Sequence, residues 1–164
     1  MIDNINMKIL AALSDDSRIS AKKIATMLGL DEKDVADRIE LMEKDGVIVK
    51  YSTVINTDKL NLQNVQALIE VKVSPQRNEG FDAIAEQLMA YEEVKSVYLM
   101  SGTYDLMLII EGSSLKEVAL FVSDKLSTAD NILSTATHFI LKRYKENGVV
   151  INGKNNEHRL VVSP

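Results

Sequence analysis

The chain has 164 residues, of which 46% are hydrophobic and 26% are charged, and its formal net charge is −5. These values are typical of a soluble globular protein with one medium or two small domains. The absence of cysteine excludes a disulfide framework, a thiolate zinc site and a thiol nucleophile. No apolar run approaches the roughly 20 residues of a membrane span, and the N-terminus lacks the pattern of a secretory signal. We therefore predict a cytoplasmic protein without a metal, a cofactor or a membrane partner.

Three short stretches of helical periodicity occupy the first part of the chain. Each begins after a residue that can cap a helix, namely Asp3, Ser20 and Asp31. Gly29 and Gly46 follow the second and third stretches, and glycine ends a helix at little conformational cost. The apolar faces comprise Ile5, Ile9 and Leu13, then Ile24 and Leu28, then Val35, Ile39 and Met42.

An extended, β-branched stretch follows these helices, from Val47 to about Ile55, and predicts a short wing or connecting strand. Three short helices with a tight glycine-containing turn between the last two, followed by a strand, are typical of a winged helix-turn-helix. A simple bundle of three amphipathic helices is the alternative. The compact pattern of residues 20–46 favours the first interpretation, so we predict a DNA-binding domain over residues 1–55 and a linker over 56–63.

The periodicity then changes to that of alternating strands and helices. Strands are predicted at 65–73, 94–100, 105–110 and 133–142, and helices at 81–88 and 115–126. The order β-α-β-β-α-β is that of a ferredoxin-like fold, an antiparallel sheet with two helices on one face. We therefore predict an α+β protein in which residues 64–145 form a ferredoxin-like βαββαβ sandwich. Residues 146–164 are expected to add a C-terminal hairpin extension that turns at Asn152-Gly153.

The strand Leu106–Ile110 is apolar at every position. Both of its faces should therefore be covered, whereas the two predicted helices cover only one. The simplest second cover is the sheet of another subunit. The sequence therefore predicts a homodimer.

Charge complicates the predicted contact with double-stranded DNA. Residues 31–45, which include the third helix, hold seven acidic and three basic residues. Carboxylates can accept a hydrogen bond from cytosine N4, but they repel phosphates, so a solvated acidic face with weak or lost binding stays open. Arg38 has the further alternative of pairing with Asp34 four residues earlier. The candidate DNA contacts are Arg18, Lys22, Lys23, Lys33, Arg38 and Lys50.

The loop Gly102-Thr103-Tyr104-Asp105 is the candidate site for a small molecule. It offers a backbone that a ligand can approach closely, two hydroxyl groups and a carboxylate that could take an ammonium group. The alternative is a plain turn in which Gly102 supplies a positive φ. Thr135 and Thr137 are either further hydroxyl groups of the pocket or simply β-branched strand residues.

Several fragments occur in a specific order and spacing over most of the chain, roughly residues 2–142. They are Asp3, Ile9-Leu10, Arg18-Ile19-Ser20, Ile24-Ala25, Leu28-Gly29-Leu30, Val35, Arg38-Ile39, Glu43, Gly46-Val47-Ile48, Gly102-Thr103-Tyr104-Asp105 and Thr135-Ala136-Thr137. Together they resemble the leucine-responsive regulator/asparagine regulator (Lrp/AsnC) family of transcription factors. The resemblance implies a third helix that reads the major groove and dimers formed through the sheets, often assembled into tetramers or octamers. It also implies that amino acids or related metabolites bind between dimers. The sequence departs from the family at Asp31, Asp34 and Leu41, where Ser, Thr and Arg are frequent.

These observations predict a sequence-specific transcription regulator that responds to an amino acid or related metabolite, and not an enzyme. Because the third helix is acidic, one alternative is an oligomerisation partner that does not bind DNA and tunes a paralogue. A second, by resemblance of architecture, is a siroheme decarboxylase. That enzyme would need basic and histidine residues for the tetrapyrrole, for which the chain offers little beyond His138, Arg143 and Lys145.

Overall fold

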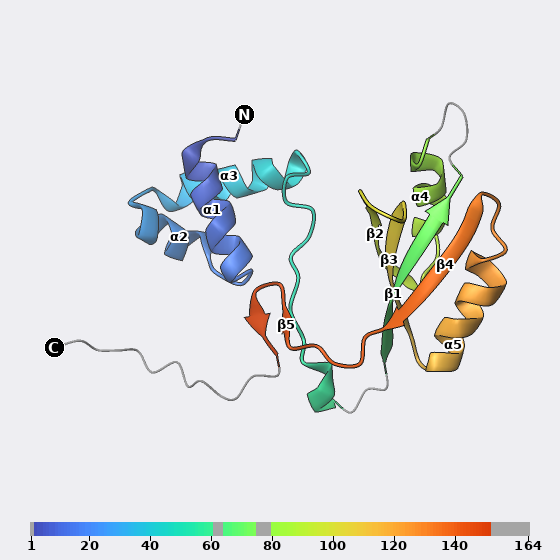
Figure 1. The fold of residues 1–164 in the computed structure, drawn as a ribbon. Helices are drawn as coiled ribbons and strands as arrows, with labels where there is room; N and C mark the ends of the chain where they lie inside the picture. The colour runs from blue at the N-terminus through green and yellow to red at the C-terminus, as the bar shows by residue number, and fades with distance from the viewer. Residues whose placement is uncertain (1, 61–63, 75–79, 152–164) are drawn as a thin grey trace. The chain divides into compact units, whose positions relative to one another are not determined.

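The computed structural model describes residues 2–60, 64–74 and 80–151, and the chain forms two compact units, Met1–Ile55 and Asn56–Pro164. Figure 1 shows the helices and strands of both units.

The first unit contains three helices: α1 (Asn4–Asp15), α2 (Ala21–Leu28) and α3 (Glu32–Lys44). The three predicted caps are confirmed, because the side chains of Asp3, Ser20 and Asp31 each accept a hydrogen bond from a backbone N–H in the first turn. Gly29 ends α2 in the left-handed conformation, with φ at 66°. The helices bury one shared core made of Ile9, Leu13, Ile24, Ala25, Val35 and Met42.

The predicted wing strand is wrong, because residues 47–56 form no strand. The N–H groups of Val47 and Ile48 both donate to the carbonyl of Met42, at 2.9 and 3.0 Å, and so complete the C-terminal end of α3. Farther on, Val49 is 89% exposed. β-Branched residues favour a strand only where a neighbouring strand is available to pair, and the described part of this unit offers none.

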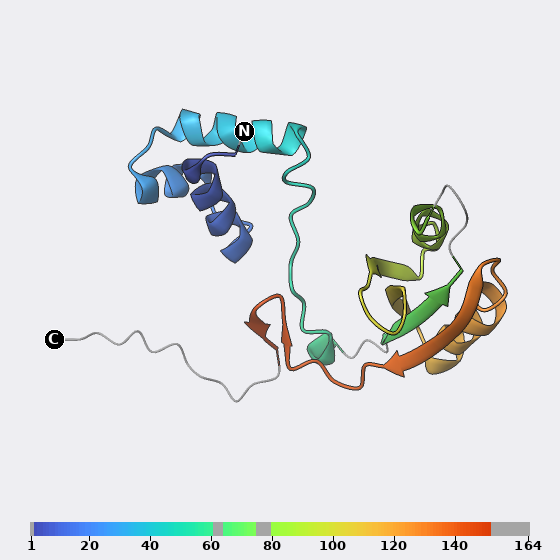
Figure 2. The same ribbon diagram turned by 45° about the horizontal axis from the view of Figure 1, so that its top comes forward.

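The second unit has the predicted ferredoxin-like order. Its elements are η1 (Thr57–Leu60), β1 (Val65–Val73), α4 (Asp82–Met89), β2 (Val94–Leu99), β3 (Leu106–Gly112), α5 (Leu115–Leu120), the π-helical segment η2 (Phe121–Leu126) and β4 (Ile132–Phe139). The four strands form one antiparallel sheet in the order β2-β3-β1-β4. The two helices lie on the same face of this sheet (Figure 2). The α+β fold class is therefore confirmed.

In the described part of the chain, helices cover only one of the two faces of the sheet. The covered face is buried under α4, α5 and η2, and its centre is Ile69, Val71, Leu106, Leu108 and Ile110. Strand residues that pair directly lie on the same face, so alternation places Leu68, Met107 and Ile109 on the opposite face. We call this second face the open face. Its three apolar residues are half-buried, and among the described residues no helix covers them.

The C-terminal hairpin forms earlier than predicted. Strands β5 (Lys145–Glu146) and β6 (Val149–Val150) pair around Asn147 and Gly148, both with positive φ. Two consecutive residues with positive φ are what a type I′ turn requires, so Asn147-Gly148 is the turn of this hairpin. The turn predicted at Asn152-Gly153 lies outside the described residues, as does the rest of the predicted extension from residue 152 onward. No helix in the described ranges is long and apolar enough to cross a membrane.

Candidate DNA-binding surface and effector loop

Five of the six candidate DNA contacts have exposed side chains. Lys22 and Lys23 lie in the first turn of α2, Lys33 lies in the first turn of α3, and Arg18 and Lys50 lie in the segments before α2 and after α3. Within the ranges that the structure covers, none of these five side chains takes part in an ion pair. Their charges are therefore available to phosphate groups.

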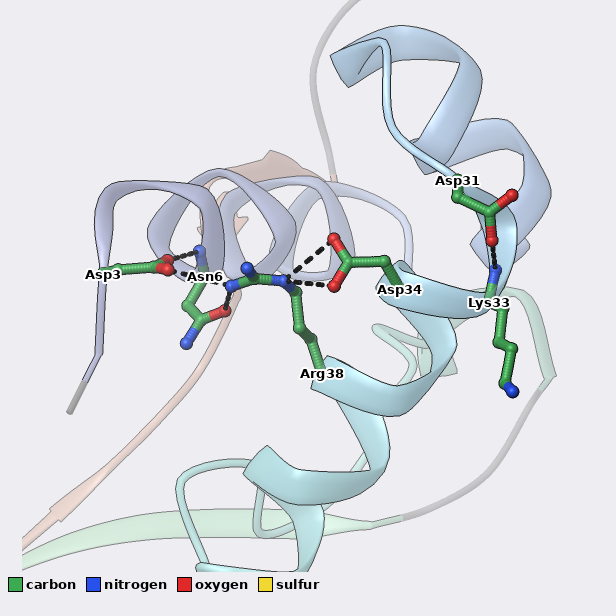
Figure 3. A network of polar contacts seen from close by, with 6 residues as sticks. All are labelled: Asp3, Asn6, Asp31, Lys33, Asp34 and Arg38. Atoms are coloured by element: carbon green, nitrogen blue, oxygen red, sulfur yellow. Dashed lines mark hydrogen bonds and ion pairs between the residues drawn. The ribbon is translucent and has the colours of Figure 1, made fainter.

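The sixth candidate, Arg38, makes its bonds within the helical unit (Figure 3). Its Nε donates to both carboxylate oxygens of Asp34 at 3.1 Å. Its Nη1 donates to Asp3 Oδ2 at 2.9 Å and to Asn6 Oδ1 at 2.8 Å. The alternative pairing with Asp34 is thus confirmed, and the same guanidinium also joins α3 to the start of α1. Asn6 is a partner that the sequence reasoning missed, because it lies 32 positions away in the chain.

Asp3 has two structural tasks in this network. One carboxylate oxygen caps α1 by accepting from the N–H of Asn6 at 2.7 Å, and the other pairs with Arg38. The Asn6 N–H and the Arg38 guanidinium hold the pKa of Asp3 below its ordinary value. The pKa of Arg38 is raised by its hydrogen bonds to Asp3 and Asp34. The ionised form of each group is therefore favoured by folding.

The acidic composition of the third helix has a partly structural origin. Asp31 accepts from the N–H of Lys33 at 2.8 Å as the N-cap, and Asp34 pairs with Arg38. Glu43 accepts from the Tyr51 hydroxyl at 2.7 Å, which raises the pKa of Tyr51 to about 12. Within the described residues, the exposed carboxylates of α3 without such a structural bond are Glu32, Asp37 and Glu40. Part of the acidic charge counted in the sequence is therefore engaged in structural bonds, although Asp31 and Glu43 remain exposed.

The effector loop lies between β2 and β3, and Gly102 at its exposed tip has an unexpected geometry. Its φ is not among the positive values of the chain, so the interpretation as a turn that needs positive φ is wrong. A Cβ atom at Gly102 would meet nothing within 4 Å. Nothing in the described part of its own chain therefore requires glycine at this position. The neighbouring Thr103 is exposed and Tyr104 is half-buried.

Asp105 is bonded to the end of β1. Its Oδ2 accepts from the N–H of Val73 at 2.9 Å. Its own N–H donates to the Val71 carbonyl at 3.1 Å, and its carbonyl accepts from the Met100 N–H at 2.8 Å. Two bonds thus fix the Asp105 end of the loop to the central strand, and the third joins the two ends of the loop to each other. The carboxylate that was predicted to face an ammonium group already holds a backbone donor.

The pairing register places Thr135 at the same end of the sheet as the loop. Thr135 pairs with Val71, and Val71 pairs on its other side with Leu106, the residue after Asp105. Direct pairing also places Thr135 on the face covered by helices, where its hydroxyl lies 3.5 Å from that of Ser127. Thr137 follows two residues later on the same face. The structure therefore brings the loop and Thr135 to one end of the sheet, and Thr137 toward its middle.

Two of the three residues considered for a tetrapyrrole, His138 and Arg143, have other partners, and Lys145 is exposed. His138 Nε2 lies 3.3 Å from Glu70 Oε1. Both belong to the open face. Arg143 donates to Glu146 at 2.7 Å and to Thr57 at 2.6 Å. These contacts give no support to a tetrapyrrole site.

Both units match known sequence families. Residues 2–49 match the profile of a winged helix-turn-helix DNA-binding domain, and residues 66–150 match the Lrp/AsnC ligand binding domain. The chain belongs to the Lrp/AsnC family. YugG, an HTH-type transcriptional regulator of Bacillus subtilis, is 48% identical over 158 residues, which cover 96% of this chain and 95% of YugG. LrpA of Pyrococcus abyssi is 31% identical over 145 residues, covering 88% of this chain and all of LrpA. These family members are transcriptional regulators, and this chain combines the same two domains.

Solved structures support the fold of this Lrp/AsnC protein. AsnC of Escherichia coli aligns with a TM-score of 0.70 at 23% identity, covering 89% of this chain and 96% of that one. The regulator NMB0573 of Neisseria meningitidis, solved as a complex with L-Met, aligns with a TM-score of 0.72 at 22% identity, covering 89% and 94%. The two-part architecture is thus shared with this family in three dimensions.

Replacing Arg38 with glutamine is expected to lower the melting temperature of the helical unit, because it removes the side chain that joins α1 to α3. The pKa of Asp3 is lowered by folding, so its stabilising effect is complete above the ordinary value of 3.8 and is lost as the pH falls through the folded value. The difference between the parent and Arg38→Gln should therefore shrink in acid. Thermal unfolding followed by helical circular dichroism from neutral to acidic pH measures this, with Arg18→Gln as the control. Equal pH profiles for the parent and Arg38→Gln would contradict the assignment.

Proposed function

We propose that this Lrp/AsnC protein is a homodimeric, sequence-specific DNA-binding transcription regulator, and not an enzyme, that responds to an amino acid or related metabolite. The observation that carries the DNA-binding part is the set of exposed bases around α2 and α3 that have no ion-pair partner among the described residues. We assign residues 1–55 to DNA binding, 56–63 to a linker, 64–145 to effector binding and oligomerisation, and 146–164 to a C-terminal extension. A cytoplasmic location agrees with this function.

For the DNA contacts we propose a division of roles among the six candidates. Lys22 and Lys23 lie at the start of the helix-turn-helix, and Arg18 and Lys50 lie on either side of it in the chain. All four are suited to phosphate contacts, which set affinity and register. Lys33 in the first turn of α3 is suited to a base edge in the major groove. Arg38 acts indirectly, because its network sets the position of α3 against α1.

The double variant Lys22→Gln/Lys23→Gln is expected to weaken binding to all duplexes, because it removes two phosphate contacts per subunit. Each lost contact should reduce the slope of log affinity against log salt by about 0.9. Fluorescence anisotropy titrations of the protein's own upstream DNA at several salt concentrations measure both quantities. Lys8→Gln/Lys116→Gln, which removes the same charge from exposed positions on α1 and α5, is the control. An unchanged salt slope in the first variant would rule out these contacts.

The second candidate function is an oligomerisation partner that does not bind DNA. The exposed carboxylates Glu32, Asp37 and Glu40 on α3 favour it, because they repel phosphates. Asp37→Asn separates the two functions, since it should raise DNA affinity in a regulator and change nothing in a pure partner. Asp34→Asn is unsuitable for this purpose because it would break the bonds to Arg38.

For the dimer we propose that the open face packs against its copy in a second subunit. Leu68, Met107 and Ile109 form its apolar centre, and they are half-buried although no described element covers them. The ion pair of Glu70 and His138 lies beside this centre. An apolar centre with polar neighbours is the usual anatomy of an interface between subunits. Such dimers could assemble further into tetramers or octamers.

The variant Ile109→Lys is expected to sediment as a monomer, because dimerisation would bury an unpaired charge. Sedimentation equilibrium at micromolar concentration measures the mass. Ala119→Lys adds the same charge at an exposed position of α5 and should remain dimeric. A monomeric parent, or a dimeric Ile109→Lys, would show that the open face is not the interface.

For the effector we propose the end of the sheet formed by Gly102, Thr103, Tyr104 and Thr135, with Thr137 deeper on the same strand. The side-chain-free backbone of Gly102 is open to a molecule from outside the chain. The family relative NMB0573 was solved with L-Met, which makes an amino acid the first class of ligand to test. Asp105 contributes to effector binding by fixing the loop to β1, and not only through the charge of its carboxylate.

The contrast between Asp105→Asn and Asp105→Ala tests this role. Asparagine can still accept from the Val73 N–H, so Asp105→Asn should keep effector binding, whereas Asp105→Ala should lose it together with protection of the Val73 amide from hydrogen exchange. Thermal-shift titrations, with L-methionine as the first probe followed by the other common amino acids, measure binding. Loss of binding in Asp105→Asn would instead assign the carboxylate to a ligand ammonium group. A flat response of the parent to every amino acid would remove the effector proposal.

A further inference from the structure

We infer that the C-terminal hairpin clamps the connection between the two units, and that Arg143 and Asn56 are positioning residues for binding by paired helix-turn-helix domains. The inference rests on the proposed function of a DNA-binding dimer. It assigns a task to β5 and β6, which lie outside both the helix-turn-helix and the sheet.

The clamp consists of three hydrogen bonds. Arg143 donates from Nη2 to Thr57 Oγ1 at 2.6 Å and from Nη1 to Glu146 Oε2 at 2.7 Å, so one guanidinium joins η1 to the hairpin. Asn56 Nδ2 donates to the Ile151 carbonyl at 3.3 Å. The start of the second unit, 86 to 95 positions away in the chain, is thereby bonded to the hairpin.

The hairpin is itself fixed. The Ile151 N–H donates to the Tyr144 carbonyl at 2.9 Å, which closes the hairpin below the β5–β6 pairing. The guanidinium of Arg143 is only partly accessible, at 25% exposure. A closed hairpin with a half-buried arginine at its base gives η1 a rigid support.

The preceding segment is bonded to the first unit. The Tyr51 hydroxyl donates to Glu43 Oε1 of α3 at 2.7 Å, and the carbonyl of Ser52 accepts from the Ser17 hydroxyl at 3.4 Å. Only residues 53–55 therefore lie between the bonds on the two sides. The clamp sets the length of the joint that carries each DNA-binding unit.

Joint length matters because a dimer binds two half-sites. Once one helix-turn-helix is bound, and provided that the clamped joint already spans the two half-sites, the second acts at an effective concentration that falls as roughly the −3/2 power of any further tether length. Without the clamp, the next residue along the chain that a strand would hold in place is Val65, at the start of β1. The joint could then extend over residues 53–64, four times its clamped length. Fourfold lengthening corresponds to a decrease of roughly eightfold in effective concentration.

The test compares Thr57→Val and Arg143→Gln with the parent, using full-length protein. Thr57→Val removes the hydroxyl acceptor and keeps every charge, so it leaves direct phosphate attraction unchanged. Lys145→Gln is the control for Arg143→Gln, because it removes the same charge at an exposed position of β5. The probes are duplexes with one half-site or two, selected from random DNA by the parent, with the two half-sites at several spacings.

Both clamp variants should bind the single half-site like the parent and the paired half-sites up to roughly eightfold more weakly. They should also discriminate less between spacings, which a general loss of stability would not produce. Equal weakening on both kinds of duplex, or unchanged binding at every spacing, would overturn the inference.

A readout without DNA keeps the clamp separate from the proposed function. Hydrogen exchange of the amides of residues 53–60 should be faster in Thr57→Val and Arg143→Gln than in Lys145→Gln and the parent. Unchanged exchange would overturn the clamp even if all variants bind DNA. Absence of DNA binding by the parent, with faster exchange in the variants, would instead overturn the regulator proposal and leave the clamp in place.

Discussion

One guanidinium group links the third helix to the start of the first. Arg38 is a base on the helix expected to read DNA, yet its bonds go to Asp34, Asp3 and Asn6 inside the protein. Because Asp3 also caps α1, the start of the first helix and the middle of the third share one network. A base on a recognition helix is therefore not automatically a DNA contact, and an acid there is not automatically a defect. Their roles depend on whether a partner in the same chain lies within reach.

The central strand has the same organising role in the second unit. β1 pairs with β3 on one side and β4 on the other, so its residues determine which side chains of the two neighbours meet. Val71 lies between Leu106 and Thr135, and Asp105 bonds to the backbone of Val71 and Val73. The conformation of the loop is thereby tied to the end of a buried strand. An effector that moves this loop would act on the sheet directly.

Local chemistry was predictable from the sequence, and contacts between distant residues were not. The caps Asp3, Ser20 and Asp31, and the alternation along β1, follow from spacing alone, and all occur in the structure. The pairing of Arg38 with Asp34 was foreseen because the two residues are four apart on one helix. Its bonds to Asp3 and Asn6, the bond of Asp105 to Val73 and the bond of Arg143 to Thr57 each join residues more than 30 positions apart. Val47 and Ile48 failed as a strand for a related reason, since strand formation depends on a partner that local propensity does not supply.

The hairpin shows how far turn composition can predict. Both Asn147-Gly148 and Asn152-Gly153 have the composition of a type I′ turn, and the longer apolar flanks of the second favoured it in the sequence, although it lies outside the described residues. The turn at Asn147-Gly148 places Tyr144 opposite Ile151 and Arg143 beside Thr57. The same β5–β6 register therefore allows both the hydrogen bond at the base of the hairpin and the bond from Arg143 to the connecting segment. The exposed carboxylates of α3 repel phosphates, so in the proposed dimer the geometry that lets two DNA-binding units act together would add to the affinity of each unit. On that proposal, a few hydrogen bonds outside the DNA-binding unit would influence binding along with the bases on it.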